Sequence, residues 1–331
     1  MAALIRAASL TGYAEAAKRA GLDPKKMLRG AGIDPSALSN PDLRIPASRV
    51  GYLLESSARE SNCPTIGLAM AESRQMSDFG ALSLLLTHQR TLRDVLATLI
   101  QYLHIVNESL ALHIEEAGDV VIVREEIVAD IGSPARQGTE LAVGVLFRLF
   151  RAVLGAGWKP ESVNFAHGGP SDIAAYRKLF GVKPVFDSSF SGIVIASRDL
   201  DRPNPTADPV MARYAKQFVE AMPGAEARST ALEVRKAIYL LLPQGRATIE
   251  QVSAGLGMNV RTLQRALEAE GEVFSYLLNG VRRDLVARYL KNEAHSLTEI
   301  SAMLGFSHSS AFSRWYAAQF GASPRERRKG K

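Results

Sequence analysis

Two segments near the C-terminal end carry polar side chains at the spacing of a single helix face. They are Arg261, Thr262, Gln264 and Arg265 in the first segment, and Ser309, Ser310, Ser313 and Arg314 in the second. In a DNA major groove, arginine pairs with the guanine edge and glutamine with the adenine edge, while serine bonds to either base type. These residues could therefore recognise bases. A helical hairpin whose polar face meets only water is the alternative interpretation.

The two segments belong to an internal repeat. Ile249–Gly271 resembles Thr298–Gly321, and the pair Leu256-Gly257 of the first copy matches Leu304-Gly305 of the second. Two copies indicate two similar modules rather than a solenoid. Each copy has the order of a helix-turn-helix, in which a short helix, a turn and a second helix follow one another.

Helix ends are predicted inside each copy. Gly257 and Gly305 can take the left-handed conformation that ends a helix. We expect the next helix to be capped by Asn259 in the first copy, and by Ser307 or Ser309 in the second. The apolar residues that we expect to point inward are Leu263 and Leu267 in the first copy, and Phe312 and Tyr316 in the second.

A long helix is predicted between the copies, over Val273–Asn292, because the segment has no proline and its apolar residues form one stripe. Twenty residues would span ~30 Å. This length is close to the ~34 Å that separate successive major-groove faces of a duplex. Arg282, Arg283 and Arg288 on this helix could meet phosphates or solvent, and the sequence does not decide between them.

Positive charge gathers in the last third of the chain. The 331 residues have a net charge of +6, and the part from Arg228 to Lys331 holds 16 Lys and Arg against 9 Asp and Glu. The rest of the chain is nearly neutral. A folded basic module is typical of a protein that binds nucleic acid, although a solvated basic surface without a partner is the alternative.

Other kinds of site find little support. No HExxH, P-loop, GxSxG or EF-hand pattern occurs, and the six histidines show no metal-ligand spacing with acids or with Cys63. We therefore expect no cofactor, no metal and no enzyme activity. No stretch approaches ~20 apolar residues, and the N-terminus lacks the core of a signal peptide. These features favour a cytoplasmic protein without a membrane segment.

The N-terminal part is predicted to be an α+β domain, mainly helical with short strands. Helices are expected over Ile5–Gly21, from Asp23-Pro24 onward, and over Ser48–Glu60, Thr91–Asn107, Gln137–Gly155, Asp172–Phe180 and Pro209–Met222. A loop is expected at Ser39–Pro46. Strands are expected over Ser109–Ile114 and Val120–Ile127, joined by a turn at Glu115–Asp119, and over Val163–Ala166, Val185–Phe186 and Gly192–Ile195.

Small and polar residues at 223–230 interrupt this pattern and predict a linker. The sequence thus predicts a regulatory domain over 1–222 and an all-α domain over 231–328. The second domain would hold one helix-turn-helix at about 248–269 and another at about 297–320, joined by the long helix.

Three segments of the C-terminal part carry a specific family resemblance. The segments GLGMNVRTLQRAL, RRDLVARYL and LTEISAMLGFSHSSAFSRWYAAQFGASPRERR resemble the DNA-binding domain of the AraC/XylS family of bacterial transcription regulators. The closing pattern is Ala311-Phe312-Ser313-Arg314, then Phe320-Gly321 and Ser323-Pro324-Arg325. The resemblance implies sequence-specific binding to double-stranded promoter DNA, usually for activation, with RNA polymerase as a further partner.

The resemblance also implies which residues would face the groove. They are Asn259, Arg261, Thr262, Gln264 and Arg265 in the first copy, and His308, Ser309, Ser310, Ser313 and Arg314 in the second. The second set departs from the family towards small residues. We therefore expect the first copy to carry more of the sequence specificity.

The N-terminal part resembles the arabinose-binding-like effector domain of one AraC-type subgroup, over about residues 4–195. The resemblance implies a small-molecule effector and does not identify it. Arg148, which interrupts an apolar helix, is a weak candidate for binding an anionic effector. A homodimer is possible. Two other functions stay open: an enzyme or metabolite-binding protein with a basic tail, and an architectural DNA binder without sequence preference.

Overall fold

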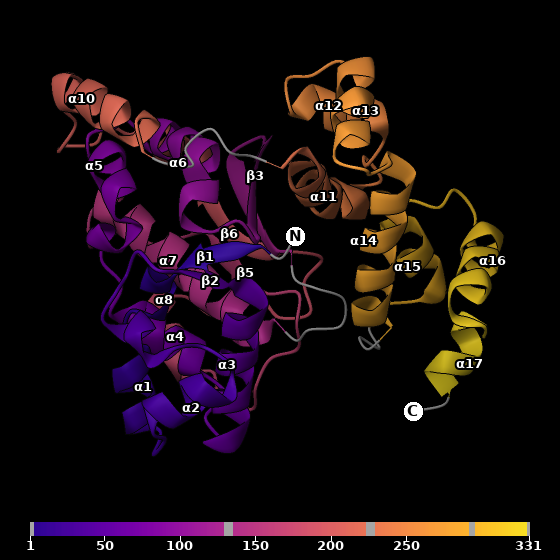
Figure 1. Ribbon diagram of the computed structural model, residues 1–331, viewed down its shortest axis with the longest axis horizontal. Coiled ribbons are helices and arrows are strands. Elements are labelled where there is room, and N and C mark those ends of the chain that lie inside the picture. Colours follow the sequence, from indigo (N-terminus) through magenta and orange to yellow (C-terminus); the bar gives the residue numbers. More distant parts are fainter. Residues whose placement is uncertain (1–2, 129–134, 223–228, 291–294, 330–331) are drawn as a thin grey trace. The chain divides into compact units, whose positions relative to one another are not determined.

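The computed structural model describes residues 3–128, 135–222, 229–290 and 295–329. It divides the chain into two compact units, Met1–Ala227 and Arg228–Lys331 (Figure 1). The predicted linker at 223–230 lies mostly outside the described residues. Of its last two residues, Ser229 caps the first helix of the second unit and Thr230 begins that helix.

A four-stranded antiparallel sheet forms the β layer of the first unit. Its strands are β3 (Leu110–Ala117), β4 (Val120–Ile127), β5 (Ser162–Asn164) and β6 (Ser191–Ala196), in the order β3-β4-β6-β5. Val121 and Val123 are fully buried on one face of β4. Gly192 has a φ of +149°, and a Cβ there would lie 2.1 Å from the Val123 carbonyl oxygen. The close approach of β6 to β4 therefore requires glycine.

The longest helix, α7 (Arg136–Leu154), packs against the sheet and against α4 (Ile66–Glu72). Small residues allow α4 and α7 to approach closely. A Cβ at Gly67 would lie 2.2 Å from the Gln137 carbonyl oxygen, and one at Gly144 would lie 2.4 Å from Ala71 Cβ. The buried face of α7 includes Leu146, Phe147 and Phe150, so this helix forms much of the core.

The first twenty residues differ from the prediction of one helix over Ile5–Gly21. They form strand β1 (Leu4–Arg6), a 3-10 turn η1 (Ala7–Leu10) and helix α1 (Tyr13–Arg19). Strand β1 pairs with β2 (Arg44–Pro46), inside the predicted loop Ser39–Pro46. The helical spacing misled because Gly12, at a φ of +80°, interrupts the helix and becomes the N-cap of α1.

The remaining helices of the first unit are α2 (Pro24–Gly30), α3 (Ala47–Glu60), α5 (Ala81–Thr87), α6 (Leu92–Val106), α8 (Ala174–Phe180), α9 (Ser197–Leu200) and α10 (Pro209–Glu220), with 3-10 turns η2 (Pro35–Leu38) and η3 (Met76–Phe79). Helices α2, α3, α6, α8 and α10 lie in predicted segments, whereas α4, α5 and α9 were not predicted. Asp23 caps α2 and Thr91 caps α6 through their side chains.

Three details of the strands differ from the prediction. Strand β5 ends at Asn164 rather than at Ala166. Strand β3 extends to Ala117, so the turn before β4 is shorter than Glu115–Asp119. Val185 forms only an isolated bridge with Asn164 rather than a strand. The predicted class, an α+β unit that is mainly helical with short strands, is confirmed.

The described part of the second unit is entirely helical, as predicted. Its elements are α11 (Thr230–Leu241), η4 (Leu242–Gln244), α12 (Ile249–Gly255), α13 (Val260–Ala269), α14 (Phe274–Tyr289), α15 (Leu297–Met303), α16 (Ser309–Phe320) and α17 (Pro324–Lys329). Helices α12 and α13 form the first motif, and α15 and α16 form the second. Helix α14 connects them along the chain (Figure 1).

Candidate nucleic-acid interface

The turn of the first motif has the predicted geometry. Gly257 has a φ of +67° and follows the C-cap of α12. The Asn259 side chain then caps α13, because its Oδ1 accepts a hydrogen bond from the Thr262 backbone nitrogen at 2.8 Å. The predicted roles of Gly257 and Asn259 in the backbone are confirmed.

The turn of the second motif is built differently at its cap. Gly305 has a φ of +70°, as expected. The N-cap of α16, however, is His308, whose side chain makes no capping hydrogen bond, so the prediction of Ser307 or Ser309 was wrong. Ser309 is the first helical residue, and its carbonyl accepts a hydrogen bond from Ser313 Oγ at 2.9 Å. The Ser313 hydroxyl is thus already engaged within the helix.

Both second helices bury their apolar face and expose their polar one. Leu263 and Leu267 of α13, and Phe312 and Tyr316 of α16, are at most 4% exposed. The exposed side chains opposite them are Asn259, Arg261, Thr262, Gln264 and Arg265 in the first motif, and His308, Ser309, Ser310, Ser313 and Arg314 in the second. Every residue predicted to face a groove is therefore accessible to a partner.

The first motif is joined to α11 through one carboxylate. Glu270, the C-cap of α13, accepts hydrogen bonds from Ser229 Oγ at 2.7 Å and from the backbone nitrogens of Thr230 and Ala231 at 2.6 and 3.1 Å. Burial tends to raise the pKa of Glu270, but these hydrogen bonds outweigh it and lower the pKa overall. The end of α13 and the start of α11 are thereby held together.

Helix α11 is in turn joined to α14 around a buried aspartate. The Arg235 guanidinium lies 2.9 Å from Asp284 Oδ2, and the Tyr239 hydroxyl donates to the same oxygen. Burial, and then the neighbouring carboxylate, raises the pKa of Tyr239. Tyr239 therefore stays protonated and serves as a structural donor.

The second motif is joined to α14 by polar contacts that sequence reasoning missed. Arg282 Nε donates to the Leu304 carbonyl at 2.9 Å, and its guanidinium lies 4.2 Å from the centre of the Phe306 ring. Trp315 Nε1 donates to Asn279 Oδ1 at 3.0 Å. These contacts fix the turn and the second helix of this motif against α14.

The prediction that Arg282 and Arg283 could meet phosphate or solvent needs correction. Arg282 is partly buried under the second motif, and this burial lowers its pKa. Arg283 donates to Gln319 Oε1 at 3.1 Å. The connecting helix is also shorter than predicted, since α14 has 16 residues and spans about 24 Å. Helix α11 and η4 supply further contacts between the motifs, so α14 alone does not set their spacing.

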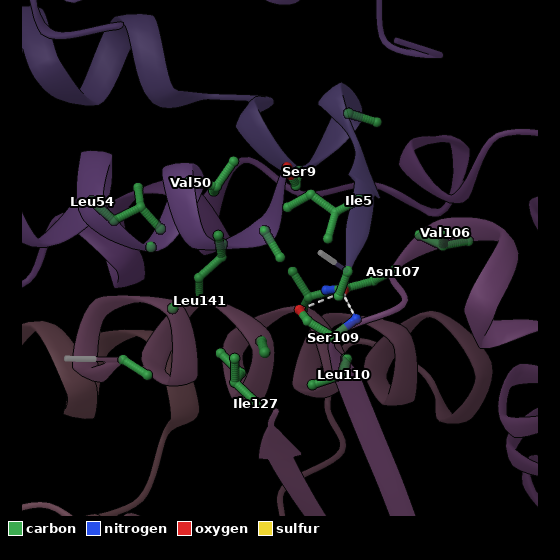
Figure 2. A pocket seen from close by; sticks show the side chains of 18 of the residues that line it. Ile5, Ser9, Val50, Leu54, Val106, Asn107, Ser109, Leu110, Ile127 and Leu141 are labelled. Atoms are coloured by element: carbon green, nitrogen blue, oxygen red, sulfur yellow. Dashed lines mark hydrogen bonds between the residues drawn. The ribbon is translucent and has the colours of Figure 1, made fainter. Parts of the chain in front are cut away.

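The first unit contains an apolar cavity of about 170 Å³ (Figure 2). It lies between β1, α3, α6 and α7 and the ends of β3 and β4, and most of its lining is aliphatic. Figure 2 shows Val50, Leu54 and Leu141 on one side of it and Ile127 and Leu110 on another. We call this cavity, with the residues that line it, the apolar cavity.

The predicted candidate Arg148 does not line the apolar cavity. Its Nε donates to the Arg74 carbonyl at 3.2 Å, and the residue borders a neighbouring cavity of about 240 Å³ together with Arg74 and Arg151. Arg74, which lines both cavities, was missed because nothing in the local sequence shows that its side chain is buried. Among the described residues, no group of His, Cys, Asp and Glu could hold a metal ion.

Two helix-turn-helix motifs on one basic, all-helical unit define the class of protein as a helix-turn-helix transcription regulator. Residues 252–330 match the family model of a helix-turn-helix domain. Residues 21–204 match the family model described as the N-terminal arabinose-binding domain of AraC transcription regulators. The chain belongs to the AraC/XylS family of transcription regulators.

Similar transcription regulators cover nearly the whole chain. The HTH-type transcriptional regulator VirS of Mycobacterium tuberculosis is 30% identical over 99% of this chain and 97% of its own length. The ornithine utilization regulator of Pseudomonas aeruginosa is 23% identical over 93% of this chain and 91% of its own. The solved structure of the regulator CdpR from the same species aligns with a TM-score of 0.45 and 20% identity, over 92% of this chain and 96% of that one.

These matches remove one of the alternatives left open by the sequence. The family and the relatives are transcription regulators and not enzymes, so the hypothesis of an enzyme with a basic tail is set aside. In the part of the chain that the structure describes, no helix is both long and apolar enough to span a membrane.

Proposed function

We propose that this chain is a sequence-specific, effector-responsive activator that inserts α13 and α16 into adjacent major grooves of promoter DNA. The observation that carries the proposal is the exposure of both polar faces on helices whose apolar faces are buried in one unit. An α-helix fits the major groove of B-DNA, and two such helices on one support can read two half-sites.

The two motifs would divide the recognition of DNA unequally. Arg261, Gln264 and Arg265 offer long donors and acceptors to base edges, and each good pair is worth roughly 1–3 kcal/mol of discrimination. The second motif offers the short side chains of Ser309 and Ser310, which suit backbone contacts and weak readout. Beside them stand His308 and a single arginine, Arg314, against two arginines and a glutamine in the first motif. Basic residues on the unit would add phosphate contacts that weaken steeply with salt.

The first unit would supply the response to a small molecule. Its apolar cavity is large enough to hold one, since an apolar cavity of about 150 Å³ can hold benzene. A ligand that favours one arrangement of the two units, or one dimer form, shifts DNA affinity or contact with RNA polymerase by linkage. We place this activity in the cytoplasm, where promoter DNA and polymerase meet.

Selection of binding sites from random double-stranded DNA by the full chain tests the DNA-binding proposal. We expect one enriched sequence with two half-sites about ten base pairs apart. Inserting about five base pairs between the half-sites turns the second one to the opposite face of the duplex and should reduce binding to the non-specific level.

Scrambled DNA of equal length and composition serves as the control in this test. An architectural binder would hold the selected and the scrambled DNA with equal affinity at the same salt concentration, and that result would overturn the proposal. Transcription from the selected site with purified RNA polymerase then tests activation, because repression or no change would contradict an activator.

A further inference from the structure

We propose that the apolar cavity binds a straight-chain aliphatic carboxylic acid of medium length, with its carboxylate at Arg74 and Ser9. The inference rests on the proposed function, because it names the chemical class of the effector.

The walls of the cavity are aliphatic and come from several elements. They include Ile5, Val50, Leu54, Val106, Leu110 and Leu141. Two polar residues in the lining satisfy one another: Asn107 Oδ1 accepts hydrogen bonds from Ser109 N at 2.9 Å and from Ser109 Oγ at 2.8 Å (Figure 2). This part of the cavity therefore offers dispersion contacts and little free hydrogen-bonding capacity.

One end of the cavity is polar, in contrast to its aliphatic walls, and it is formed by Ser9 and Arg74. Arg74 is 5% exposed, and its guanidinium donates to the carbonyls of Ala8 and Ser9. Among the described residues, Arg74 Nε and Ser9 Oγ are buried and have no hydrogen-bond partner. Because a buried donor without a partner destabilises the protein, a ligand acceptor placed here would bring a gain that the empty protein lacks.

The Arg74 guanidinium favours a carboxylate over a neutral head group, although the nearby Asp78 balances its charge. Burial lowers the pKa of Arg74 to about 10, and the group is still protonated at neutral pH. The facing acid is Asp78, whose Oδ2 lies 3.9 Å from Arg74 and already accepts a hydrogen bond from the Gln75 backbone nitrogen at 2.9 Å. A charge-assisted hydrogen bond to the guanidinium is stronger than one between neutral groups.

The same lining argues against a sugar, despite the arabinose in the name of the matching family model. A sugar carries a hydroxyl on almost every carbon, and each hydroxyl must find a partner when it is buried. The aliphatic walls provide none. A cavity of about 170 Å³ instead suits an apolar body of roughly six to eight carbons, judged against benzene in a cavity of about 150 Å³.

Calorimetric titration of the full chain with butanoate, hexanoate, octanoate, decanoate, 1-octanol and arabinose tests the inference. We expect the Kd to fall about three- to fourfold per added methylene up to about eight carbons and then to stop falling. Octanoate should bind about tenfold more tightly than 1-octanol, and arabinose should not bind. Binding of arabinose, or no binding of any acid, would overturn the inference.

A cavity-filling variant locates the site. Gly51 of α3 lines the cavity on the same helix face as Ala47 and Leu54, and a Cβ there meets no heavy atom within 4 Å. Gly51→Leu should fold and should weaken octanoate binding at least tenfold. Gly30→Leu is the matched control, because Gly30 ends α2 away from the cavity and its Cβ also meets nothing within 4 Å. Equal weakening by both variants would contradict the assignment.

Ser9→Ala tests the polar end without removing Arg74, whose guanidinium also holds two backbone carbonyls. Deleting a hydroxyl that has no partner should leave the free protein as stable as before. The affinity for octanoate should fall about fivefold. A stability loss with unchanged affinity would show that Ser9 is structural, and it would overturn its role at the carboxylate.

The outcomes separate this inference from the proposed function. If octanoate binds at Gly51 but leaves the affinity for the selected DNA unchanged, the effector response fails while the site assignment stands. If a compound of another class changes DNA affinity and no acid binds, the inference fails while the effector response stands.

Discussion

The two helix-turn-helix motifs share a turn but differ in what holds them and in what they offer to DNA. The first motif has a side-chain cap on its second helix, an aliphatic core and long polar side chains. The second lacks a side-chain cap on its second helix and has an aromatic core of Phe306, Phe312, Trp315 and Tyr316. The two copies thus share a backbone arrangement, but different side-chain contacts stabilise it in each copy.

This difference suggests that the two motifs of one unit serve two tasks, reading the DNA sequence and positioning the unit on the duplex. Helix α13, whose long side chains we propose to reach base edges, is fixed by local capping and by Glu270 at its far end. Where the side chains are short, α14 fixes the helix through Arg282 and Asn279. We interpret the first motif as the reader of sequence and the second as the part that positions the unit on the duplex.

The largest expected effect concerns the aromatic core. Phe312 is 1% exposed and its ring centre lies 5.8 Å from Phe306 and 6.0 Å from Tyr316. Phe312→Ala should destabilise the second motif by roughly 3–5 kcal/mol, because it leaves a cavity among rings that cannot collapse into it. Hydrogen exchange of the α15 and α16 amides measures the loss. Phe320→Ala is the comparison: Phe320 of the same helix is 44% exposed and its ring packs against Tyr316 and Trp315, so its loss should cost clearly less than that of Phe312.

Arg282→Met tests how the second motif is held. Losing the hydrogen bond to the Leu304 carbonyl should destabilise this motif by roughly 1.5–3 kcal/mol, while exchange in α13 stays the same. If Arg282 instead served to bind phosphate, stability would not change and the salt dependence of DNA binding would lose about one unit of slope. That pattern would contradict the structural role.

Arg265→Ala tests which motif reads sequence. We expect a loss of roughly 1–3 kcal/mol, or about five- to 150-fold, in affinity for the selected site, with relaxed preference at one base pair. Ser313→Ala should change affinity less than about twofold, because the hydroxyl already donates to the Ser309 carbonyl. A larger effect from Ser313→Ala would reverse the division of tasks.

Arg246→Ala is the charge-matched control for Arg265. Arg246 is exposed between η4 and α12, outside the second helix of either motif. Its removal should weaken binding to selected and scrambled DNA alike, since it can contribute only charge near the backbone. Base preference should therefore be unchanged in this variant.

The second unit could be predicted from the sequence in most respects. The repeat located both turns, and the buried residues Leu263, Leu267, Phe312 and Tyr316 followed from helical periodicity. The cap at His308 could not be predicted, because three polar residues in a row can each begin a helix. Nor could the role of Arg282, because an arginine on a helix looks the same in sequence whether it meets solvent or a carbonyl 22 residues away.

The first unit shows where sequence reasoning ends. Periodicity predicted α3, α6 and α7, but the strand at Leu4–Arg6 depends on pairing with residues 44–46, which local patterns do not reveal. The apolar cavity depends on elements from β1 to α7 that meet only in the fold. Arg148 was considered because it interrupts an apolar helix, whereas the buried arginine is Arg74, in the turn after α4.

The smallest expected effect compares two carboxylates under acid. Backbone and side-chain hydrogen bonds from Ser296 lower the pKa of Glu299 below its usual 4.5. For Glu270, burial tends to raise the pKa, but hydrogen bonds from Ser229, Ala231 and Thr230 lower it overall. A lowered pKa in the folded state gives stability that is present above pH 4.5 and is lost as the pH falls through the folded value.

The stability lost on protonation should differ between Glu299 and Glu270, because the two carboxylates hold different parts of the unit together. Glu299 accepts from Ser296, three residues away, so its protonation should loosen only the first turn of α15. Glu270 joins the end of α13 to the start of α11 across about forty residues, so its protonation should loosen the attachment of the first motif. Both groups are largely exposed, and screening by solvent keeps both effects small. Hydrogen exchange between pH 6 and pH 3 should therefore lose protection in α13 before α15, and Glu270→Gln should remove that difference. Equal losses in α13 and α15, or a difference that survives Glu270→Gln, would show that this carboxylate does not hold the first motif in place.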